Sequence, residues 1–244
     1  MRLTGNDVLI TGGSRGIGRG IAEALLRLGN EVTIAGRDEA ALVNVVHANP
    51  GMHYGVVDQA DPIAITRFAA ELSAERPHLN VLINNAGVQR VEDVTRGELA
   101  AAEEQIATNL LGPIRLTAAL IAGLLAQPHA AIVNVTSGLA FVPKAATPTY
   151  CATKAALHSY TQSLRYQLRD TSVEVIEIIP PQVSTALRDV DDPRALPLAD
   201  YIGETMALLT NGDDPEITVS KVKSLREAER NHSYDKLFSM INPA

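Results

Sequence analysis

Several residue types are scarce or missing in this sequence. Trp is absent, Phe occurs three times, and aromatic residues make up 4% of the 244 residues. This scarcity argues against a surface of aromatic platforms that stack on single-stranded nucleic acid. Acidic residues outnumber basic ones by 28 to 21, giving a net charge of −7, so a nucleic acid or an anionic membrane would be repelled overall. We therefore expect no nucleic-acid partner.

Cysteine and long hydrophobic runs are also rare. The single cysteine, Cys151, excludes an internal disulfide and fits a reducing compartment; we interpret it as a small packed side chain rather than a redox sensor. No stretch reaches the roughly 18 uninterrupted apolar residues of a membrane span, and the first residues show no secretory signal. These absences predict a cytoplasmic protein without an integral membrane segment.

Short runs rich in Val and Ile alternate with helical patterns along the whole chain. Such runs, without strict polar alternation, are typical of parallel strands buried on both faces. The predicted strands cover residues 8–11, 31–35, 53–57, 81–84, 131–137, 173–179 and 216–219. The alternation predicts a single doubly wound α/β domain of Rossmann type over residues 1–244, with a parallel sheet of about seven strands and helices on both faces.

The clearest predicted helices cover residues 17–28 and 153–168, the second entering after Pro148. Residues 180–197 combine Pro, Asp and Arg without periodicity and directly follow a predicted strand. We interpret this segment as a substrate loop, because ligands bind beyond the carboxyl ends of parallel strands; an ordinary surface loop is the alternative. Residues 221–241 are charged and predicted to be helical.

A glycine-rich turn follows the first predicted strand and opens the first helix. The sequence from Thr11 to Gly18 lets backbone N–H groups approach a pyrophosphate at the positive end of that helix. The spacing of its glycines resembles that of the short-chain dehydrogenase/reductase family. The resemblance implies that the nucleotide cofactor is bound by Gly12, Ser14, Arg15, Gly16, Ile17 and Gly18.

The residues after the second predicted strand bear on the choice of cofactor. An acidic residue that would accept a bond from a free ribose 2′-hydroxyl is expected there, but the chain has Gly36-Arg37. The guanidinium groups of Arg37 and Arg15 can pair with a 2′-phosphate, which predicts NADP(H). In the alternative, Arg37 pairs with Asp38 or Glu39 and Arg15 points into solvent, leaving NAD preferred.

Two further segments resemble cofactor contacts of the same family. Asp58 resembles the contact to the adenine ring, although Gln59 follows where the family usually has an apolar residue. Residues 84–87 resemble the family's N-N-A-G signature, which implies that Asn85, Ala86 and Gly87 line the cofactor. Helix capping would also explain Asp58, and an ordinary turn would explain the Asn and Gly residues.

Tyr150 and Lys154 are four residues apart, so on a helix both project from one face. A nearby ammonium stabilises a phenolate and draws the tyrosine pKa toward neutrality, and Ser137 can hydrogen-bond an oxygen that develops charge. Together they resemble the family's Ser and Tyr-x-x-x-Lys constellation. Asn109 matches its fourth member, which holds a proton-relaying water, and Lys154 is also expected to bind the nicotinamide ribose. Singly each residue has a structural explanation, but their joint order and spacing favour catalysis.

Residues 137–143, 150–159 and 168–177 resemble a bacterial DltE-type branch of the family. The resemblance implies cofactor contacts from Pro180, Val183 and Thr185, although Pro181 stands where the family usually has Gly, which stiffens the backbone. The Gly-rich ending common in tetrameric members is missing. By analogy we expect a homodimer formed through the helices around Asn109 and Tyr150.

The resemblance implies an NADP(H)-dependent oxidoreductase that interconverts a small-molecule carbonyl and a secondary alcohol, with Tyr150 as acid or base and without a metal. The substrate pocket is expected from residues 139–143 and 182–198, whose composition has no recognisable chemical signature. Two alternatives stay open at this point. One is an NAD-dependent alcohol dehydrogenase, and the other is a non-catalytic NADP-binding sensor or assembly protein.

Overall fold

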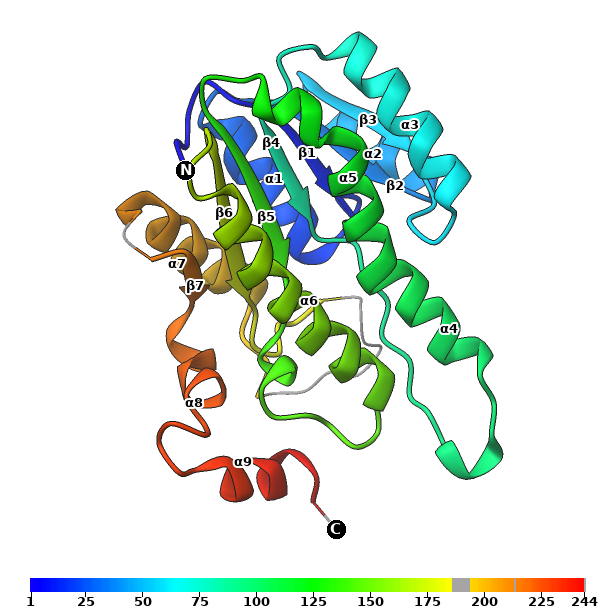
Figure 1. Cartoon of the computed structure of the whole chain (residues 1–244), viewed down its shortest axis with the longest axis vertical. Coiled ribbons are helices and arrows are strands. Elements are labelled where there is room, and N and C mark those ends of the chain that lie inside the picture. Colours follow the sequence, from blue (N-terminus) through cyan, green and yellow to red (C-terminus); the bar gives the residue numbers. More distant parts are fainter. Residues whose placement is uncertain (186–193, 213, 244) are drawn as a thin grey trace.

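The computed structural model describes residues 1–185, 194–212 and 214–243. At its centre lies a seven-stranded sheet of order β3-β2-β1-β4-β5-β6-β7 in which all neighbouring strands are parallel (Figure 1). The strands are β1 (Asp7–Thr11), β2 (Glu31–Gly36), β3 (Met52–Val56), β4 (Val81–Asn84), β5 (Ala130–Val135), β6 (Val173–Ile179) and β7 (Glu216–Thr218). The strand order reverses between β1 and β4, and such a switch point opens a ligand crevice at the carboxyl edge of the sheet.

Apolar side chains leave the strands alternately toward two hydrophobic cores. On β1, Val8 and Ile10 enter one core and Leu9 enters the other, and all three are fully buried. Because successive strand residues point to opposite faces, a strand covered on both sides must be apolar throughout. This geometry explains the uninterrupted Val and Ile runs of the sequence.

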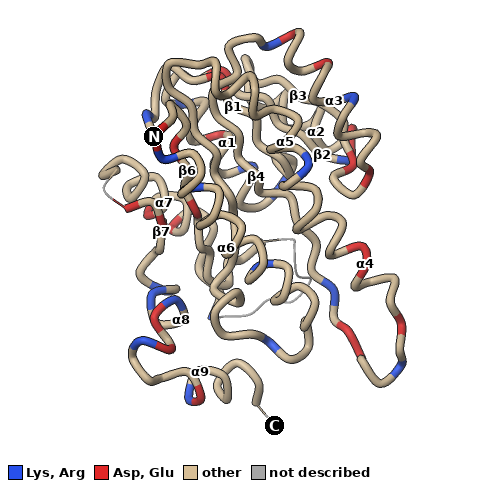
Figure 2. Tube along the Cα trace, in the orientation of Figure 1, with Lys and Arg blue, Asp and Glu red and all other residues tan. Residues whose placement is uncertain are grey.

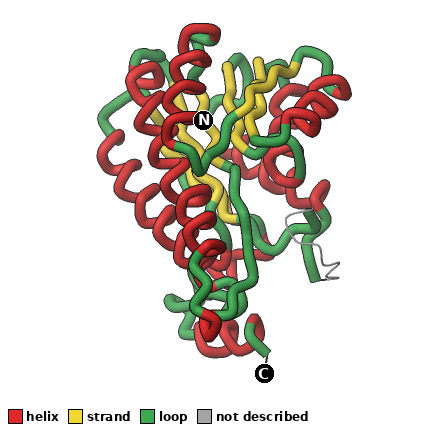
Figure 3. The backbone as a smooth tube through the Cα atoms, turned by 90° about the vertical axis from the view of Figure 1, so that its right-hand side faces the viewer, coloured by secondary structure: helices red, strands yellow, loops and turns green. Residues whose placement is uncertain are grey.

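Helices cover both faces of the sheet, as Figure 3 shows. Residues of α1, α2 and α7 fill one core, and residues of α3, α5 and α6 fill the other. The main helices are α1 (Gly16–Arg27), α2 (Glu39–Ala48), α3 (Pro62–Glu75), α4 (Ala100–Ile106), α5 (Gly112–Leu125), α6 (Pro148–Leu168) and α7 (Leu198–Asn211). The predicted doubly wound α/β domain with a parallel sheet of seven strands is therefore confirmed.

The catalytic-helix candidate α6 begins five residues earlier than the sequence prediction of residue 153. Pro148 occupies the first turn, where its fixed φ suits a helix and its missing N–H costs no hydrogen bond. The carboxylate of Glu92 accepts bonds from the Thr149 backbone N–H (3.1 Å) and hydroxyl (2.7 Å). A side-chain acceptor distant in sequence thus secures the start of the helix.

A polar ladder crosses the core between β4, β5 and α6. Asn84 donates to Asn134 Oδ1 (2.9 Å) and to Thr117 Oγ1 (3.2 Å), and Asn134 donates to Thr161 Oγ1 (2.9 Å). All four side chains are buried, and buried polar groups are tolerated when they bond to one another. The ladder fixes α6 against the centre of the sheet.

One helical stretch among the described residues, Ala100–Leu125, is long and apolar enough to cross a membrane by length and composition alone. It comprises α4, a π-helical turn η2 (Ala107–Leu111) and α5. Core helices of globular proteins meet the same criterion, and 44% of the apolar window is buried inside the protein. The stretch is therefore weak evidence for a span, and the expected lack of an integral membrane segment stays a prediction.

The segment 221–241 contains two helices, α8 (Lys223–Arg226) and α9 (Tyr234–Ile241). Positions of basic and of acidic residues alternate along this part of the chain in Figure 2. Just after α9, Asn242 accepts a bond from Ala145 N (2.6 Å) and donates to Pro143 O (3.1 Å). The end of the chain therefore holds the loop that precedes α6.

Candidate active site

The predicted site residues gather at the carboxyl edge of the sheet. Strands β1, β4, β5 and β6 end at Thr11, Asn84, Val135 and Ile179, and the glycine turn, the Asn85–Gly87 segment, Ser137 and Pro180 directly follow them. Because the strands are parallel, these ends lie at one edge. The sequence motifs thus become neighbours in space.

The glycine turn is shaped by close backbone approaches. Gly12 and Gly16 have φ of +67° and +56°, a region that side chains rarely allow. A Cβ added at Gly18 would lie 2.3 Å from Asn85 Nδ2 and 2.5 Å from Gly12 O. Only glycine fits there, so the turn can press against the Asn85–Gly87 segment.

The first turn of α1 is free to bind an anion. Its N-cap residue, Arg15, makes no side-chain capping bond, and the first turn contains no acidic residue. Backbone N–H groups at such an uncapped helix start bind phosphate well. Together with the lack of side chains at Gly12, Gly16 and Gly18, this geometry fits the pyrophosphate of a dinucleotide.

The Asn85–Gly87 segment links the glycine turn to α6. Thr11 Oγ1 accepts bonds from the N–H groups of Asn85 and Ala86, each at 3.0 Å, and Asn85 Nδ2 donates to Thr11 O (2.9 Å). A Cβ added at Gly87 would lie 3.4 Å from Asn109 Oδ1 and 3.8 Å from Lys154 Nζ. Thr11, which the sequence interpretation did not assign a role, therefore sets the position of this segment.

Arg15 and Arg37 are both exposed. Arg37 Nη1 lies 3.9 Å from Glu104 Oε1 of α4, whereas Asp38 accepts the Ala41 N–H at the start of α2 and Glu39 accepts the hydroxyl of Tyr54. The alternative pairing of Arg37 with Asp38 or Glu39 is therefore not the one in the structure. Nearby, Asp58 accepts the backbone N–H of Ala60 (2.9 Å), an Asx-type turn.

Gln59 is a buried amide next to Asp58, with 3% of its surface exposed. Neither its Oε1 nor its Nε2 has a hydrogen-bond partner among the described residues. A Cβ added at Gly112 would lie 2.9 Å from Gln59 Oε1. The glycine at the start of α5 therefore makes room for a polar side chain where the family usually has an apolar one.

Tyr150 and Lys154 lie one turn apart on α6, as their spacing predicts, and 7% and 4% of their surfaces are exposed. Lys154 Nζ is 5.8 Å from the centre of the Tyr150 ring and donates to Val135 O (2.8 Å). Burial lowers the pKa of Lys154 to about 8, and the charge of Glu177 opposes this shift. Ser137, 8% exposed, lies at the end of β5, where its Oγ accepts the Leu139 N–H (3.1 Å).

Asn109 lies in the π-helical turn η2 and is fully buried. Its Oδ1 accepts Val88 N–H and its Nδ2 donates to Val88 O, both at 2.8 Å. The Nδ2 also donates to Thr153 Oγ1 (3.3 Å), and Thr153 in turn donates to Tyr150 O (2.7 Å). Asn109 therefore ties the segment after Gly87 to the backbone of the tyrosine, and Thr153 is a connector that spacing alone did not reveal.

The segment after β6 returns across the glycine turn. Pro180 O accepts Gly138 N–H (2.9 Å), and a Cβ added at Gly16 would lie 3.3 Å from Thr185 Cβ. Val183 forms an isolated parallel bridge with Leu196, so the two ends of the predicted substrate loop lie together. Residues 186–193 of this loop lie outside the described residues.

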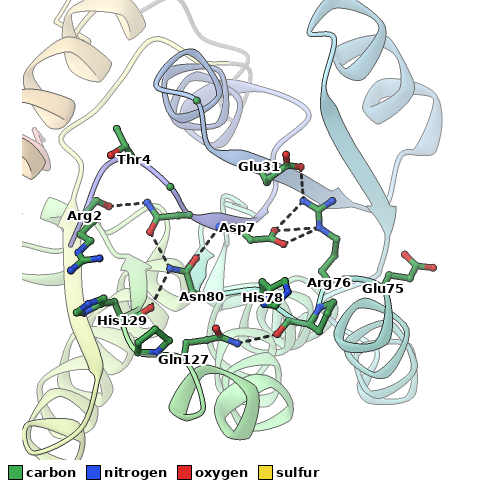
Figure 4. A pocket seen from close by; sticks show the side chains of 15 residues that line it. Arg2, Thr4, Asp7, Glu31, Glu75, Arg76, His78, Asn80, Gln127 and His129 are labelled. Atoms are coloured by element: carbon green, nitrogen blue, oxygen red, sulfur yellow. Dashed lines mark hydrogen bonds and ion pairs between the residues drawn. The ribbon is translucent and has the colours of Figure 1, made fainter.

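A pocket of about 700 Å³ lies at the opposite edge of the sheet. Figure 4 shows that its polar side chains bond to one another: Arg76 to Asp7 and Glu31, and Asn80 to His129 O. Asp7 and Glu31 are the first residues of β1 and β2. This pocket is therefore remote from every predicted site residue, and we base the active-site assignment on the motifs and their geometry.

Cys151, next to Tyr150, is buried, and burial raises the pKa of its thiol. Its Sγ accepts the backbone N–H of Lys144 (3.3 Å). A thiol with a raised pKa is a poor nucleophile at neutral pH, which agrees with the interpretation as a packed side chain.

Comparisons with known proteins place this geometry in a family. The family model for short chain dehydrogenases matches residues 6–194. The chain belongs to the short-chain dehydrogenase family. This membership confirms the resemblance predicted from the glycine spacing and the Tyr150–Lys154 pair, and it makes the protein a member of an oxidoreductase family.

Two relatives and one solved structure are informative. This short-chain dehydrogenase is 46% identical to the uncharacterized oxidoreductase DltE of Bacillus subtilis over 99% of this chain and 98% of DltE, which confirms the DltE-type branch. It is 30% identical to the NADP-dependent 3-hydroxy acid dehydrogenase YdfG of Shigella flexneri over 71% of each chain. A crystal structure of a short-chain dehydrogenase from Burkholderia cenocepacia in complex with NADP superposes with a TM-score of 0.84 and 24% identity, covering 99% of each chain.

Proposed function

We propose that this short-chain dehydrogenase is an NADP(H)-dependent oxidoreductase that interconverts a small-molecule carbonyl and a secondary alcohol. The observation that carries the proposal is the buried placement of Tyr150 and Lys154, with Lys154 Nζ 5.8 Å from the centre of the Tyr150 ring, at the edge of the sheet where the segment of Ser137 and the uncapped start of α1 also lie. When bound, the cofactor supplies or accepts the hydride. No metal ligand is needed for this chemistry.

Side chains of the protein transfer the proton, support the charge of Tyr150 and position the reacting groups. Tyr150 donates its phenolic proton to the carbonyl oxygen during reduction and removes a proton from the alcohol during oxidation. Lys154 is buried, so its positive charge acts strongly on the neighbouring phenol and stabilises the phenolate form. Ser137 hydrogen-bonds the same oxygen. Asn109 positions the Tyr150 backbone through Thr153 and holds Val88.

We propose NADP(H) rather than NAD(H) because the chain has an arginine, and not an acidic residue, at the first position after β2, and a second arginine in the glycine turn. Arg37 follows β2, Arg15 precedes α1, and both are exposed. The weak 3.9 Å contact of Arg37 with Glu104 can be exchanged for bidentate bonds to a phosphate. NADP also appears in the names of YdfG and the Burkholderia complex.

The remaining expected cofactor contacts come from residues at the same edge of the sheet. We assign the pyrophosphate to Gly12, Ser14, Gly16, Ile17 and Gly18, the adenine to Asp58, the nicotinamide side to Pro180, Val183 and Thr185, and the cofactor wall to Asn85, Ala86 and Gly87. A cytoplasmic location and the use of residues 180–197 as a substrate loop stay predictions.

A homodimer through the helices around Asn109 and Tyr150, which are α4, α5 and α6, also remains a proposal. Ile106 and Leu125 on these helices are 41% and 43% exposed, and pairing this surface would bury them. Light scattering of the purified protein tests the proposal; a monomer at tens of micromolar would contradict it.

NADPH consumption by a panel of ketones, aldehydes and acyl thioesters tests the proposed activity. We expect turnover by the wild type and a loss of at least about 100-fold in Tyr150→Phe, with NADPH binding retained. Binding without turnover of any substrate, together with an unchanged cellular phenotype in Tyr150→Phe, would indicate a sensor or assembly role instead.

Titration with both cofactors tests the assigned preference. We expect NADPH to bind more tightly than NADH, and Arg37→Asp to weaken NADPH binding while sparing NADH. Tighter binding of NADH by the wild type, or an unchanged preference in Arg37→Asp, would contradict the NADP(H) assignment. Because the chain has no Trp, nucleotide fluorescence can be followed with little protein background.

A further inference from the structure

A buried carboxylate lies beside the catalytic lysine and has no part in the chemistry described so far. Glu177 of β6 is 0% exposed. Thr136 Oγ1 donates to its Oε1 (2.6 Å), and His158 Nδ1 lies 2.8 Å and 3.0 Å from its two oxygens. A carboxylate withdrawn from water costs several kcal/mol unless it is bonded or paired. The surrounding groups therefore hold Glu177 in one place.

The backbone brings Glu177 and Lys154 to the same region. Lys154 Nζ donates to Val135 O, and Val135 is followed by Thr136, the residue that bonds to Glu177. His158 follows Lys154 by one turn on α6, so both project from the same helix face. The lysine is thus bonded to the last residue of β5 and the carboxylate to the residue that follows it, and Lys154 and His158 lie on adjacent turns of α6.

The second carboxylate near Glu177 is paired with an arginine. On β7, Glu216 bonds to Arg226 of α8 at 2.7 Å and 3.2 Å. Ligand atoms of His158, Glu177 and Glu216 lie within 4.8 Å of one another, but the guanidinium bonds take up the Glu216 carboxylate. The charged groups on the elements packed here are His158 and Arg165 of α6, Glu216 of β7, Arg226 of α8 and Asp214 before β7.

The same cluster reaches the expected substrate pocket. The ring of Phe141 meets the His158 ring edge-to-face at 4.8 Å, and the Arg226 guanidinium lies 4.7 Å from the centre of the Phe141 ring. Phe141 belongs to the segment 139–143 that is expected to line the pocket. His158 therefore touches both the pocket wall and Glu177.

We propose that Glu177 is a positioning residue that keeps the ammonium of Lys154 charged in its buried place beside Tyr150, with Thr136 and His158 holding the carboxylate. The catalytic consequence rests on the proposed function, because it concerns the support that Lys154 gives to Tyr150. The effect of Glu177 on the charge of Lys154 does not depend on the proposed function.

The direction of the effect follows from the charges. Burial lowers the pKa of Lys154 to about 8, and the Coulombic attraction of Glu177 raises it. Without that carboxylate, burial would act unopposed and the lysine would lose its proton at a lower pH. Neutral Lys154 supports neither a phenolate nor a bound ribose as strongly, so activity would decline at a lower pH.

Lysine-selective ¹³C NMR of the protein without nucleotide measures the Lys154 pKa directly. The chain has only five lysines to assign: Lys144, Lys154, Lys221, Lys223 and Lys236. We expect a pKa close to 8 in the wild type and a value about one pH unit lower in Glu177→Gln. Glu177→Asp keeps the negative charge, so the Lys154 pKa in this variant should stay close to the wild-type value.

Glu174→Gln is the matched control, because Glu174 lies on the same strand with 61% of its side chain exposed. We expect it to leave the Lys154 pKa unchanged. If Glu177→Gln does not fold, Glu177→Met removes the same charge with an apolar side chain of similar size, a change that buried ion sites often tolerate.

The alkaline limb of the pH profile of kcat/KM supplies the catalytic readout, and the pH dependence of NADPH affinity supplies a binding readout. In Glu177→Gln we expect the midpoint of the alkaline limb of kcat/KM and the midpoint of the fall in NADPH affinity to shift to lower pH by about one unit. An unchanged Lys154 pKa in the neutral variants, or a wild-type pKa at the ordinary value of lysine, would overturn the proposal. A lower Lys154 pKa in Glu177→Gln, together with no NADPH turnover by the wild type or by any variant, would instead support the electrostatic role and contradict the proposed function.

Discussion

Replacement of Lys154 by Met should make the protein more stable at neutral pH while removing its activity. Lys154 is 4% exposed, and burial lowers its pKa from 10.5 to about 8. A difference of this size corresponds to about 3 kcal/mol in favour of the neutral lysine in the folded protein. Met fills a similar volume without a charge, so Lys154→Met should raise the free energy of unfolding at pH 7 by up to about 3 kcal/mol.

The pH dependence of this gain distinguishes a charge effect from better packing. Between pH 8 and pH 10.5 the unfolded chain binds more protons than the folded protein at this site, so the wild type becomes more stable as pH rises through that window. The variant has no proton to lose there. The stability difference should therefore be largest below pH 8 and shrink toward pH 10.5.

Urea unfolding followed by circular dichroism, at fixed ionic strength between pH 6.5 and the alkaline limit of the wild type, measures this difference. Lys236→Met is the matched control, because Lys236 lies exposed on α9 and should change stability by less than about 0.5 kcal/mol. A variant that is no more stable than wild type at pH 7 would refute the reasoning. A gain that does not vary with pH would refute the assignment of the effect to the buried charge.

Two further substitutions test the packing that positions the site. Gly18→Ala should abolish nucleotide binding and lower the free energy of unfolding by about 2 kcal/mol, because the new Cβ would lie 2.3 Å from Asn85 Nδ2. Gly123→Ala is the control, because a Cβ there would have nothing within 4 Å. This control should leave the free energy of unfolding unchanged or raise it by up to about 1 kcal/mol. Isothermal titration with NADPH and urea unfolding check both, and equal effects would contradict the geometric account. Asn134→Ala should lower the free energy of unfolding by about 2 kcal/mol in urea, since Asn84 Nδ2 loses a buried acceptor and Thr161 Oγ1 loses a buried donor. The exposed Asn231→Ala is the control, and a cost no larger than that of the control would show that the ladder adds little.

Local patterns in the sequence were sufficient to predict the fold. The central strands were visible as Val- and Ile-rich runs, because burial on both faces of a parallel sheet removes polar alternation, whereas the edge strand β3 is largely exposed and carries His53 and Tyr54. The first predicted helix agrees with α1 within one residue at each end, since Gly29, with φ +82°, ends the helix visibly in sequence. The start of α6 was placed too late because Glu92, 57 positions away from Thr149, supplies the acceptor.

The candidate active site was predictable only in part, for a related reason. Tyr150 and Lys154 were recognisable because one helical turn separates them, and the glycine turn was recognisable because its residues are contiguous. The partners of Lys154 and Glu177 come from β5, β6 and α6, which only the folded chain brings together. The contact of Arg37 with Glu104 likewise joins β2 to α4, and no local pattern signals it.

Hydride transfer from deuterated NADPH tests the central proposal most directly. With a substrate found in the carbonyl panel, the alcohol formed from NADPH deuterated at C4 is analysed by mass spectrometry, using both C4 epimers in separate reactions. We predict deuterium at the carbinol carbon from one epimer only, with formation of the labelled alcohol strongly reduced in Tyr150→Phe. Alcohol without deuterium from either epimer, or labelled alcohol formed equally fast by Tyr150→Phe, would contradict the proposed mechanism.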